Sequence, residues 1–331
     1  MTGSASATRI EFPGLFDLQV NGFAGVDFNA PDLTADAVGA ALEKMRACGV
    51  TRVLPTLITS PLADFAASAR VIAGMTDDAI AGIHMEGPYI SPDDGPRGAH
   101  PRAHIRAASP DDFERRQAAA LGRIVLVTLA PEVPGALPLT EWLAAAGVRV
   151  AIGHTAASSA QIVDAVAAGA TLSTHLGNGC AAVLPRHPNV IWEQLAADRL
   201  HASLIVDGHH LPPATVKAMV RAKGADRTIL VTDATAAAGR VPGRYRMGAV
   251  DCELGVDGRV SLVGTPFLAG SSLTLDRAIA TTVRYTGLPI ASVIPMASRI
   301  PAQYLGMTTA GTVTADWDTE RFELNIQRIE I

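Results

Sequence analysis

The residues of this sequence that could do chemistry follow the ends of short apolar runs. Ionisable or amide side chains cluster in six such places: Asp17–Gly22, His84–Pro88, Gly153–Thr155, Thr174–Asn178, Asp207–His210 and Thr232–Thr235. Parallel strands that are buried on both faces should be nearly continuous in apolar residues, so polar groups at their ends need another explanation. If the runs are strands of one barrel, all of these groups converge at one mouth, where an active site would lie.

Three of these residues have the types of a catalytic metal site. Glu86, His154 and His175 supply one carboxylate and two imidazoles, a set that holds a divalent metal and leaves a position open for water. A single histidine is more often a satisfied buried group, but three separate strands with matched ligand types favour a metal site. His84 lies two residues before Glu86 and points to the same face, so it is either a rival ligand or a support behind the ligands.

Asp233 is an isolated carboxylate at the end of the apolar run Ile229–Val231. As a structural residue it would be a helix N-cap, because Asp caps helices well. As a functional residue it would be the general base that takes a proton from water at the metal. The accompanying metal set favours the functional interpretation.

The apolar runs that position these residues are rich in Val, Ile and Leu, and each is followed by a loop and an Ala-rich helical pattern. This alternation predicts parallel βα units, and about eight of them predict a closed (β/α)8 barrel of the TIM type. The predicted strands lie near Gly14–Val20, Thr51–Leu54, Ala79–Met85, Arg123–Leu129, Val148–Ile152, Thr171–Ser173, Ala202–Val206 and Thr228–Val231.

Two of the predicted helices have clear end signals. Thr34 fits an N-cap, an apolar stripe follows it at i, i+4 and i+7, and Gly49 can close the end. Ser158 and Gln161 form a capping-box pattern, and Gly169 ends that segment. The buried stripe expected on the second helix consists of Ile162, Val163 and Val166. Two stretches rich in Gly and Pro, 87–101 and 238–264, are candidate active-site loops.

The composition agrees with one large folded core. The chain has 331 residues, of which 48% are hydrophobic and 18% charged, and this excludes disorder as the main state. The formal net charge is −5 and no basic run occurs, which argues against nucleic acid or an anionic membrane as partner and favours a small molecule.

Cysteine usage and the absence of apolar targeting segments predict a cytoplasmic location. Cys48, Cys180 and Cys252 are widely separated and form no CxxC pair, so neither a disulfide framework nor a thiolate zinc cage is indicated. The first residues lack the apolar region of a secretory signal, and no uninterrupted apolar stretch of about 18 residues follows. We therefore expect a soluble protein of the reducing cytoplasm.

Seven segments in sequence order resemble the N-acetylglucosamine-6-phosphate deacetylases of the amidohydrolase superfamily. They are PGLFDLQVNGFAG, HMEGPYI with RGAH downstream, IGHTAASS, STHLGNG, IVDGHH, LVTDATAAAG and LAGSSLT, and the resemblance spans roughly Phe12 to Thr274. The resemblance implies a metal-dependent (β/α)8 barrel that hydrolyses the acetamide of an amino-sugar phosphate to acetate and the free amine.

Position by position, the resemblance puts Glu86, His154 and His175 on the metal and makes Asp233 the catalytic acid/base, in agreement with the residue types. It adds His100, in the RGAH turn, as a second catalytic residue near the scissile carbonyl. The substrate-binding residues expected on this basis are Gln19, Gly87, Asn178, Gly179, Arg186, His210 and Leu268.

Two of these residues have a more specific expected role. Arg186 would clamp the substrate phosphate from a neighbouring subunit, which implies a homodimer. Leu268 would line the acyl pocket. His209, beside His210, is an extra histidine with no assigned role.

The sequence departs from the superfamily in its first strand. Many amidohydrolases carry His-x-His there, whereas this chain has Gln19-Val20-Asn21. The ligands for a second metal are therefore missing, and we expect one divalent metal ion per subunit, with zinc as the first candidate.

The ends of the chain also depart from the family, which usually builds a β-sandwich from both termini. We expect a catalytic barrel over residues 13–310 and a small terminal β add-on from 1–12 and 311–331, so that the sandwich is rudimentary or missing. The last segment, Arg321–Ile331, has the alternation of a strand and could pair with Thr8–Phe12.

The leading functional hypothesis is a single-metal hydrolase that removes the acetyl group of an N-acetylhexosamine 6-phosphate, with N-acetylglucosamine 6-phosphate as the first candidate. The alternatives are a related amidohydrolase that acts on another N-acyl amine or on a non-phosphorylated N-acetyl sugar, and a sugar-phosphate-binding protein without catalysis. The sequence does not separate gluco from galacto substrates, because that choice depends on the pocket around one hydroxyl.

Overall fold

The computed structural model describes residues 7–331; residues 1–6 of the expected terminal add-on lie outside the described part. Eight parallel strands form one sheet in the order β11-β10-β9-β8-β7-β6-β5-β2. Their bounds are β2 Leu15–Val20, β5 Val50–Ile58, β6 Ile83–Glu86, β7 Ile124–Leu129, β8 Arg149–Ile152, β9 Leu172–Ser173, β10 His201–Leu204 and β11 Thr228–Leu230. Each contains or overlaps one predicted strand.

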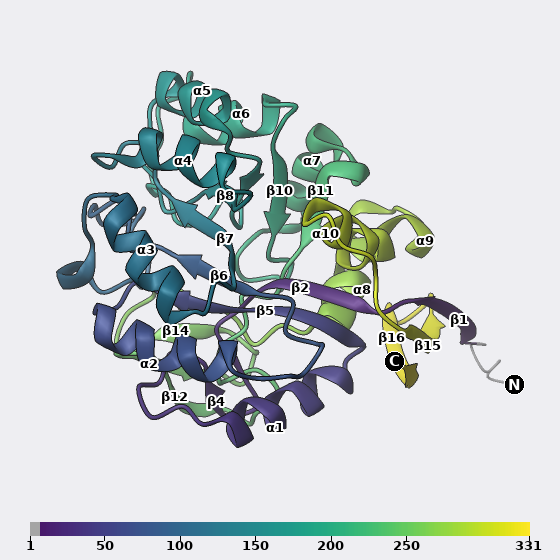
Figure 1. Cartoon of the computed structure of the whole chain (residues 1–331). Coiled ribbons are helices and arrows are strands. Elements are labelled where there is room, and N and C mark those ends of the chain that lie inside the picture. Colours follow the sequence, from purple (N-terminus) through teal and green to yellow (C-terminus); the bar gives the residue numbers. More distant parts are fainter. Residues whose placement is uncertain (1–6) are drawn as a thin grey trace, which may run out of the picture.

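The sheet closes on itself between β2 and β11. Val20 and Ala234 form a parallel bridge, and the Asp233 N–H donates to the Gln19 carbonyl at 2.9 Å. Figure 1 shows the helices packed around the outside of the strands. The predicted (β/α)8 barrel is confirmed. Helices cover one side of its strands and the barrel interior the other, so most strand residues are apolar; Asp17, Thr56 and Thr128 are buried polar exceptions.

Ten α-helices and three short 3-10 helices surround or connect the strands in residues 7–331. The α-helices are α1 Ala35–Arg46, α2 Leu62–Ala73, α3 Pro110–Ala119, α4 Ala136–Ala145, α5 Ser159–Ala168, α6 Val190–Ala196, α7 Pro213–Lys223, α8 Leu275–Thr286, α9 Ile290–Val293 and α10 Arg299–Tyr304; the 3-10 helices are Arg102–His104, Ala225–Arg227 and Ile294–Ala297. None of the described helices is long and apolar enough to cross a membrane.

The two predicted helix starts are present in the structure. The Thr34 side chain accepts from the Ala37 N–H at the start of α1, and Ser158 and Gln161 form a reciprocal capping box at the start of α5. The expected stripe on α5 is wrong at Val163, which is 58% exposed. A helical residue next to Ile162 is rotated by about 100° away from it, so Ile162 and Ala165 face the core instead.

The terminal segments form a separate three-stranded antiparallel sheet beside the barrel (Figure 1). It consists of β1 (Thr8–Pro13), β15 (Thr312–Asp318) and β16 (Glu323–Glu330) in the order β1-β15-β16. The sequence suggested that the last strand pairs with the first, and this is wrong. The strand β15 lies between them and pairs with both.

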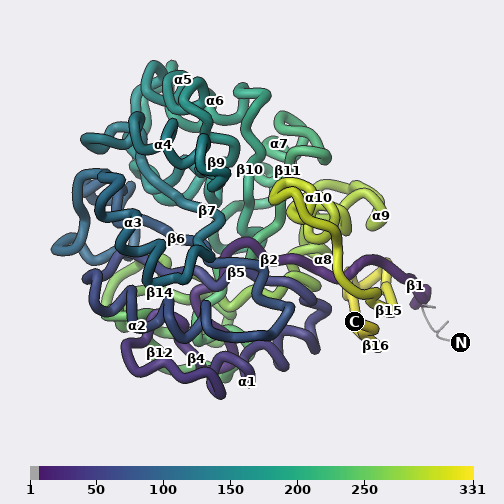
Figure 2. The backbone as a smooth tube through the Cα atoms, viewed as in Figure 1, coloured from purple at the N-terminus to yellow at the C-terminus, as the bar shows by residue number. Residues whose placement is uncertain are grey.

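A second small sheet is inserted between β11 and α8. It contains β12 (Gly243–Met247), β13 (Val250–Leu254) and β14 (Val260–Leu262), all antiparallel. The Gly248 N–H donates to the Asp27 carboxylate at 2.6 Å, which ties the insertion to the two-stranded ribbon of β3 (Gly22–Phe23) and β4 (Val26–Asp27). Figure 2 shows the insertion in light green beside the purple β4 segment.

Candidate metal-dependent active site

The chemically competent side chains lie at the carboxyl ends of different barrel strands. Glu86 ends β6, whereas His154, His175 and Asp233 follow β8, β9 and β11 within three residues. The last three have left-handed backbone conformations, with φ of 50°, 29° and 52°. Such conformations are costly for residues other than glycine and cluster at functional sites. Three of the six non-glycine residues with positive φ in residues 7–331 thus lie at the carboxyl ends of the barrel strands.

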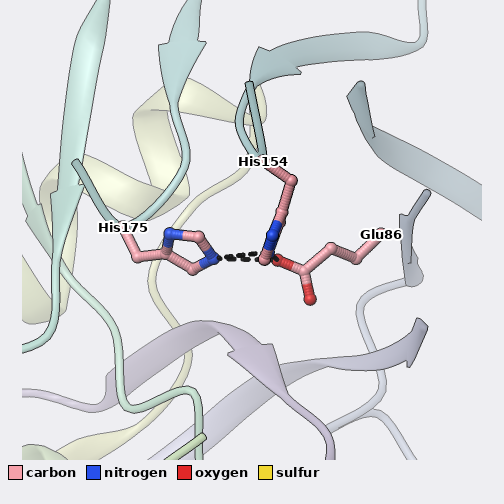
Figure 3. A group of neighbouring side chains, drawn as sticks. All are labelled: Glu86, His154 and His175. Carbon is pink, nitrogen blue, oxygen red and sulfur yellow. Dashed lines mark hydrogen bonds and ion pairs between the residues drawn. The ribbon is translucent and has the colours of Figure 1, made fainter. Parts of the chain in front are cut away.

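Glu86, His154 and His175 converge on one point (Figure 3). Their candidate ligand atoms all lie within 4.8 Å of one another. The Nε2 atom of His175 is 3.1 Å from both Glu86 Oε1 and His154 Nε2, and His154 Nε2 is 3.3 Å from the same carboxylate oxygen. All three residues are buried.

The hydrogen bonding of His154 shows what this cluster can accommodate. Its Nδ1 lies 2.9 Å from the Pro96 carbonyl oxygen, which can only accept, so Nδ1 carries the proton and Nε2 presents a lone pair. Two imidazole nitrogens and one carboxylate oxygen thus face one another at 3.1–3.3 Å. A divalent cation satisfies all three at once, so the residues fit a metal ion.

His84 is placed behind this cluster rather than in it. Its Nδ1 is 3.1 Å from the Leu18 carbonyl oxygen and its Nε2 is 2.7 Å from the Thr128 hydroxyl. Burial lowers the pKa of His84 to about 4, so the ring is neutral. Both nitrogens are occupied, which disfavours the rival-ligand interpretation and favours a support under the barrel mouth.

Two amides from β2 and the residue after it hold the carboxylates. Gln19 Nε2 donates to Glu86 Oε1 at 2.8 Å and to Asp233 Oδ1 at 3.2 Å. Asn21 Nδ2 donates to the same Asp233 oxygen at 2.6 Å. Burial, and next the charge of Glu86, raise the pKa of Asp233. No described helix begins at Asp233, so its structural interpretation as an N-cap is wrong.

His100 has a defined tautomer. The backbone N–H of Thr59, which can only donate, points to His100 Nδ1 at 3.4 Å, and the Thr59 hydroxyl lies 2.9 Å from the same atom. Nδ1 is therefore an acceptor, and a neutral His100 carries its proton on Nε2. That atom lies 3.8 Å from Glu86 Oε2, so His100 places an N–H donor beside the candidate metal ligands.

A cavity of about 560 Å³ opens beside these residues. The predicted residues that line it are Glu86, His100, His154, His175, Asn178, Gly179, His210, Asp233 and Leu268. Gln19 and Gly87 lie behind this lining: the amide of Gln19 is used by the carboxylates, and a Cβ on Gly87 would lie 2.2 Å from the Thr59 hydroxyl oxygen. Arg186 is exposed and does not line the cavity of its own chain.

Sequence reasoning missed several lining residues. Arg97 and Asp94 come from the first Gly/Pro-rich loop, where Arg97 donates to the His100 carbonyl at 2.9 Å and to Asp94 at 2.6 Å. The RGAH segment was the signal for Arg97. Met247 and Leu262 come from the inserted sheet, and no pattern in the sequence pointed to them individually.

Comparison with known proteins decides the family. The model of the amidohydrolase family matches residues 10–318. The chain belongs to the amidohydrolase family. It is 36% identical to the N-acetylglucosamine-6-phosphate deacetylase of Bos taurus over 89% of this chain and 74% of that protein. It is 35% identical to an N-acetylgalactosamine-6-phosphate deacetylase of Escherichia coli, over 89% of this chain and 78% of the relative.

Solved structures of this amidohydrolase group agree with the fold. The crystal structure of N-acetyl-D-glucosamine-6-phosphate deacetylase from Mycobacterium smegmatis has a TM-score of 0.90 and 32% identity, and the match covers 98% of this chain and 86% of that one. A mutant of an enzyme of that name from the same organism was solved in complex with N-acetyl-D-glucosamine-6-phosphate. The resemblance found in the motifs is confirmed, as is the expectation that the chain is an amidohydrolase enzyme.

Proposed function

We propose that this amidohydrolase removes the acetyl group of an N-acetylhexosamine 6-phosphate, with N-acetylglucosamine 6-phosphate as the first candidate, and releases acetate and the amino-sugar phosphate. One observation carries the proposal: the cluster of Glu86, His154 and His175 opens on a cavity that Asp233 and His100 also line. The names of the two relatives given above describe deacetylases of this class of substrate.

Glu86, His154 and His175 would hold one divalent metal, with zinc as the first candidate because two imidazoles and a carboxylate are a common zinc set. When bound, such a metal lowers the pKa of water and polarises a carbonyl. Gln19 and Asn21 stand where other amidohydrolases have His-x-His, and both direct N–H groups at carboxylates. This arrangement favours one metal per chain over two.

The catalytic roles of His100 and Asp233 depend on which of their atoms can donate or accept a proton. The His100 Nε2–H would donate to the oxygen of the acetyl carbonyl as negative charge develops there. Asp233 would accept a proton from the attacking water and then deliver that proton to the departing amine nitrogen as the C–N bond breaks. Gln19 and Asn21 hold one Asp233 oxygen, which leaves the other free for this transfer.

We place the sugar phosphate near Asn178, the Gly179 backbone and His210, and the acetyl methyl near Leu268, all of which line the cavity. Gln19 and Gly87 would support this surface from behind. Arg186 would complete the phosphate site of a neighbouring subunit, so the working form would be a homodimer.

Two broader proposals concern the whole chain. The division into a barrel of residues 13–310 and a terminal add-on of 1–12 and 311–331 follows the separate sheet of β1, β15 and β16. A cytoplasmic location follows the cysteine usage and the class of substrate.

A second candidate substrate is a non-phosphorylated N-acetyl sugar or another N-acyl amine. It is favoured by the position of Arg186 outside the cavity of its own chain. The test is acetate release by the metal-loaded protein from N-acetylglucosamine 6-phosphate, N-acetylgalactosamine 6-phosphate and both sugars without phosphate. We expect kcat/KM to be highest for a phosphorylated sugar. Higher kcat/KM for an unphosphorylated sugar would favour the second candidate.

A further inference from the structure

Three polar side chains fill a layer of the barrel interior beneath the candidate metal ligands. They are His84 on β6, Thr128 on β7 and Thr174 directly after β9, and their relative exposures are 1%, 0% and 3%. Interior layers of such barrels are usually filled by branched apolar residues. An imidazole and two hydroxyls at these positions therefore need partners, and the proposed catalytic cycle does not use them.

The three side chains form one continuous chain of hydrogen bonds. His84 Nε2 lies 2.7 Å from the Thr128 hydroxyl, which lies 2.7 Å from the Thr174 hydroxyl. His84 Nδ1 is 3.1 Å from the Leu18 carbonyl oxygen, which only accepts, so Nδ1 carries the proton. With its single proton there, His84 accepts the Thr128 O–H at Nε2, and Thr128 accepts the Thr174 O–H. Loss of the Thr128 hydroxyl would leave both neighbours without this partner.

This chain of hydrogen bonds spans the same arc of the barrel as the metal ligands. The strands β6, β7, β8 and β9 are neighbours in the sheet. Glu86 lies two residues after His84, and His175 directly follows Thr174. Side chains two residues apart on a strand point to the same face, so His84 lies below Glu86. The strand β7 carries none of the three proposed ligands, and Thr128 is its link in the chain.

The backbone between the two threonines passes very close to both. A Cβ on Gly153 would lie 2.8 Å from the Thr128 methyl carbon and 2.8 Å from the Thr174 Cβ. These distances are shorter than van der Waals contact, so glycine is what lets the two threonines meet across this backbone. His154 follows Gly153 directly. The hydrogen-bonded chain therefore lies beside the residue that precedes the second candidate ligand.

We infer that Thr128 is a positioning residue: its hydroxyl holds the ends of β6, β8 and β9 at the separation that the three candidate metal ligands need to share one ion. The inference rests on the proposed metal site and not on the choice of substrate. Replacing a group behind metal ligands commonly lowers metal affinity about 10–100-fold. We therefore expect an effect on metal affinity although Thr128 does not line the cavity.

Two substitutions of Thr128 separate the hydroxyl from packing. Thr128→Val removes the hydroxyl and keeps the shape of the side chain, whereas Thr128→Ser keeps the hydroxyl and removes the methyl group. Zinc affinity is measured by chelator competition with the purified zinc-loaded protein, and thermal unfolding is recorded in parallel. We expect Thr128→Val to weaken zinc binding about 10-fold and Thr128→Ser to remain within about 3-fold of wild type. A role limited to packing predicts the reverse order, because Ser leaves a gap beside Gly153.

Thr171→Val is the matched control, because Thr171 lies at the opposite end of β9 from Thr174. The Thr171 hydroxyl is 3.0 Å from the Tyr304 hydroxyl, so this substitution also breaks a pair of hydroxyls. Zinc affinity should stay at the wild-type level. If Thr128→Val does not fold, Thr174→Val interrupts the same chain one link away and should weaken zinc binding by a similar factor.

The outcomes separate the role of Thr128 from the proposals on which it rests. Unchanged zinc affinity in Thr128→Val, or in Thr174→Val where it replaces that variant, would overturn the inference. An equal loss in Thr171→Val, or a larger loss in Thr128→Ser than in Thr128→Val, would also overturn it. Wild-type protein that retains no zinc against the chelator would overturn the proposed metal site itself. Tight zinc binding without acetate release from any of the sugars would overturn the proposed function and not the role of Thr128.

Discussion

Replacement of Asp233 by Asn separates proton transfer from every other property of the site. Asn21 and Gln19 donate to one oxygen of Asp233 at 2.6 and 3.2 Å, and the amide oxygen of Asn can accept both hydrogen bonds. The φ of 52° at this position is also tolerated by Asn better than by most residues, whereas Ala would add backbone strain. The variant should therefore fold with the same side-chain orientation.

The expected loss of turnover can be estimated from the proton transfer that Asp233→Asn removes. The Asn amide cannot accept a proton from water or return one to the amine, and general acid–base catalysis contributes on the order of 10²–10⁴-fold. This corresponds to about 3–5 kcal/mol in the activation barrier. The proposed metal ligands Glu86, His154 and His175 do not include Asp233, so metal content should remain at the wild-type level, and KM should change less than kcat.

The assay combines acetate release, elemental analysis and thermal unfolding of the same Asp233→Asn preparation. Asp36→Asn, an exposed carboxylate in the first turn of α1, controls for purification and trace metal. A kcat within 3-fold of wild type at equal metal content would refute the reasoning and remove Asp233 from the mechanism. Loss of metal together with activity would instead show that Asp233 helps to bind the ion.

Three further predictions test other parts of the site. Glu86→Gln should lower metal occupancy and turnover together, as measured by elemental analysis and acetate release, and full occupancy would contradict its role as a ligand. Gly179→Ala would place a Cβ 2.9 Å from His154 Nδ1 and should weaken metal binding in a chelator competition, whereas Gly39→Ala, with no atom within 4 Å of its Cβ, should not. Arg186→Ala should raise KM for the phosphorylated sugar more than for its unphosphorylated analogue, and a mixture of Arg186→Ala and Asp233→Asn subunits should regain activity by forming hybrid dimers. Failure to regain activity in a mixture shown to exchange subunits would place Arg186 outside the neighbouring site.

The barrel was predictable because its signals are local. Each strand is a short apolar run, and the polar residue types at the run ends are incompatible with a buried strand interior. Closure of the barrel then brings Glu86, His154 and His175 together, although 89 residues separate the first from the last. The capping residues Thr34 and Ser158 were similarly readable, because a cap involves residues only three positions apart.

Features that depend on long-range packing were not predictable in the same way. The strand β15 separates the two terminal strands, and its alternating pattern does not specify which partner it takes. The contribution of Met247 and Leu262 to the cavity depends on how the inserted sheet folds over the barrel mouth. Val163 shows the limit of a single apolar stripe, because one residue of offset turns a helical side chain from core to solvent.

The central claim is that this chain is a single-metal deacetylase of an N-acetylhexosamine 6-phosphate. The most direct test is to remove metal from the purified protein with a chelator, titrate zinc back, and measure acetate and free amine released from N-acetylglucosamine 6-phosphate. We predict equimolar acetate and amine, with activity that rises linearly and levels off at about one zinc per chain. Full turnover without metal, a plateau near two zinc ions per chain, or no acetate at full occupancy would contradict the account.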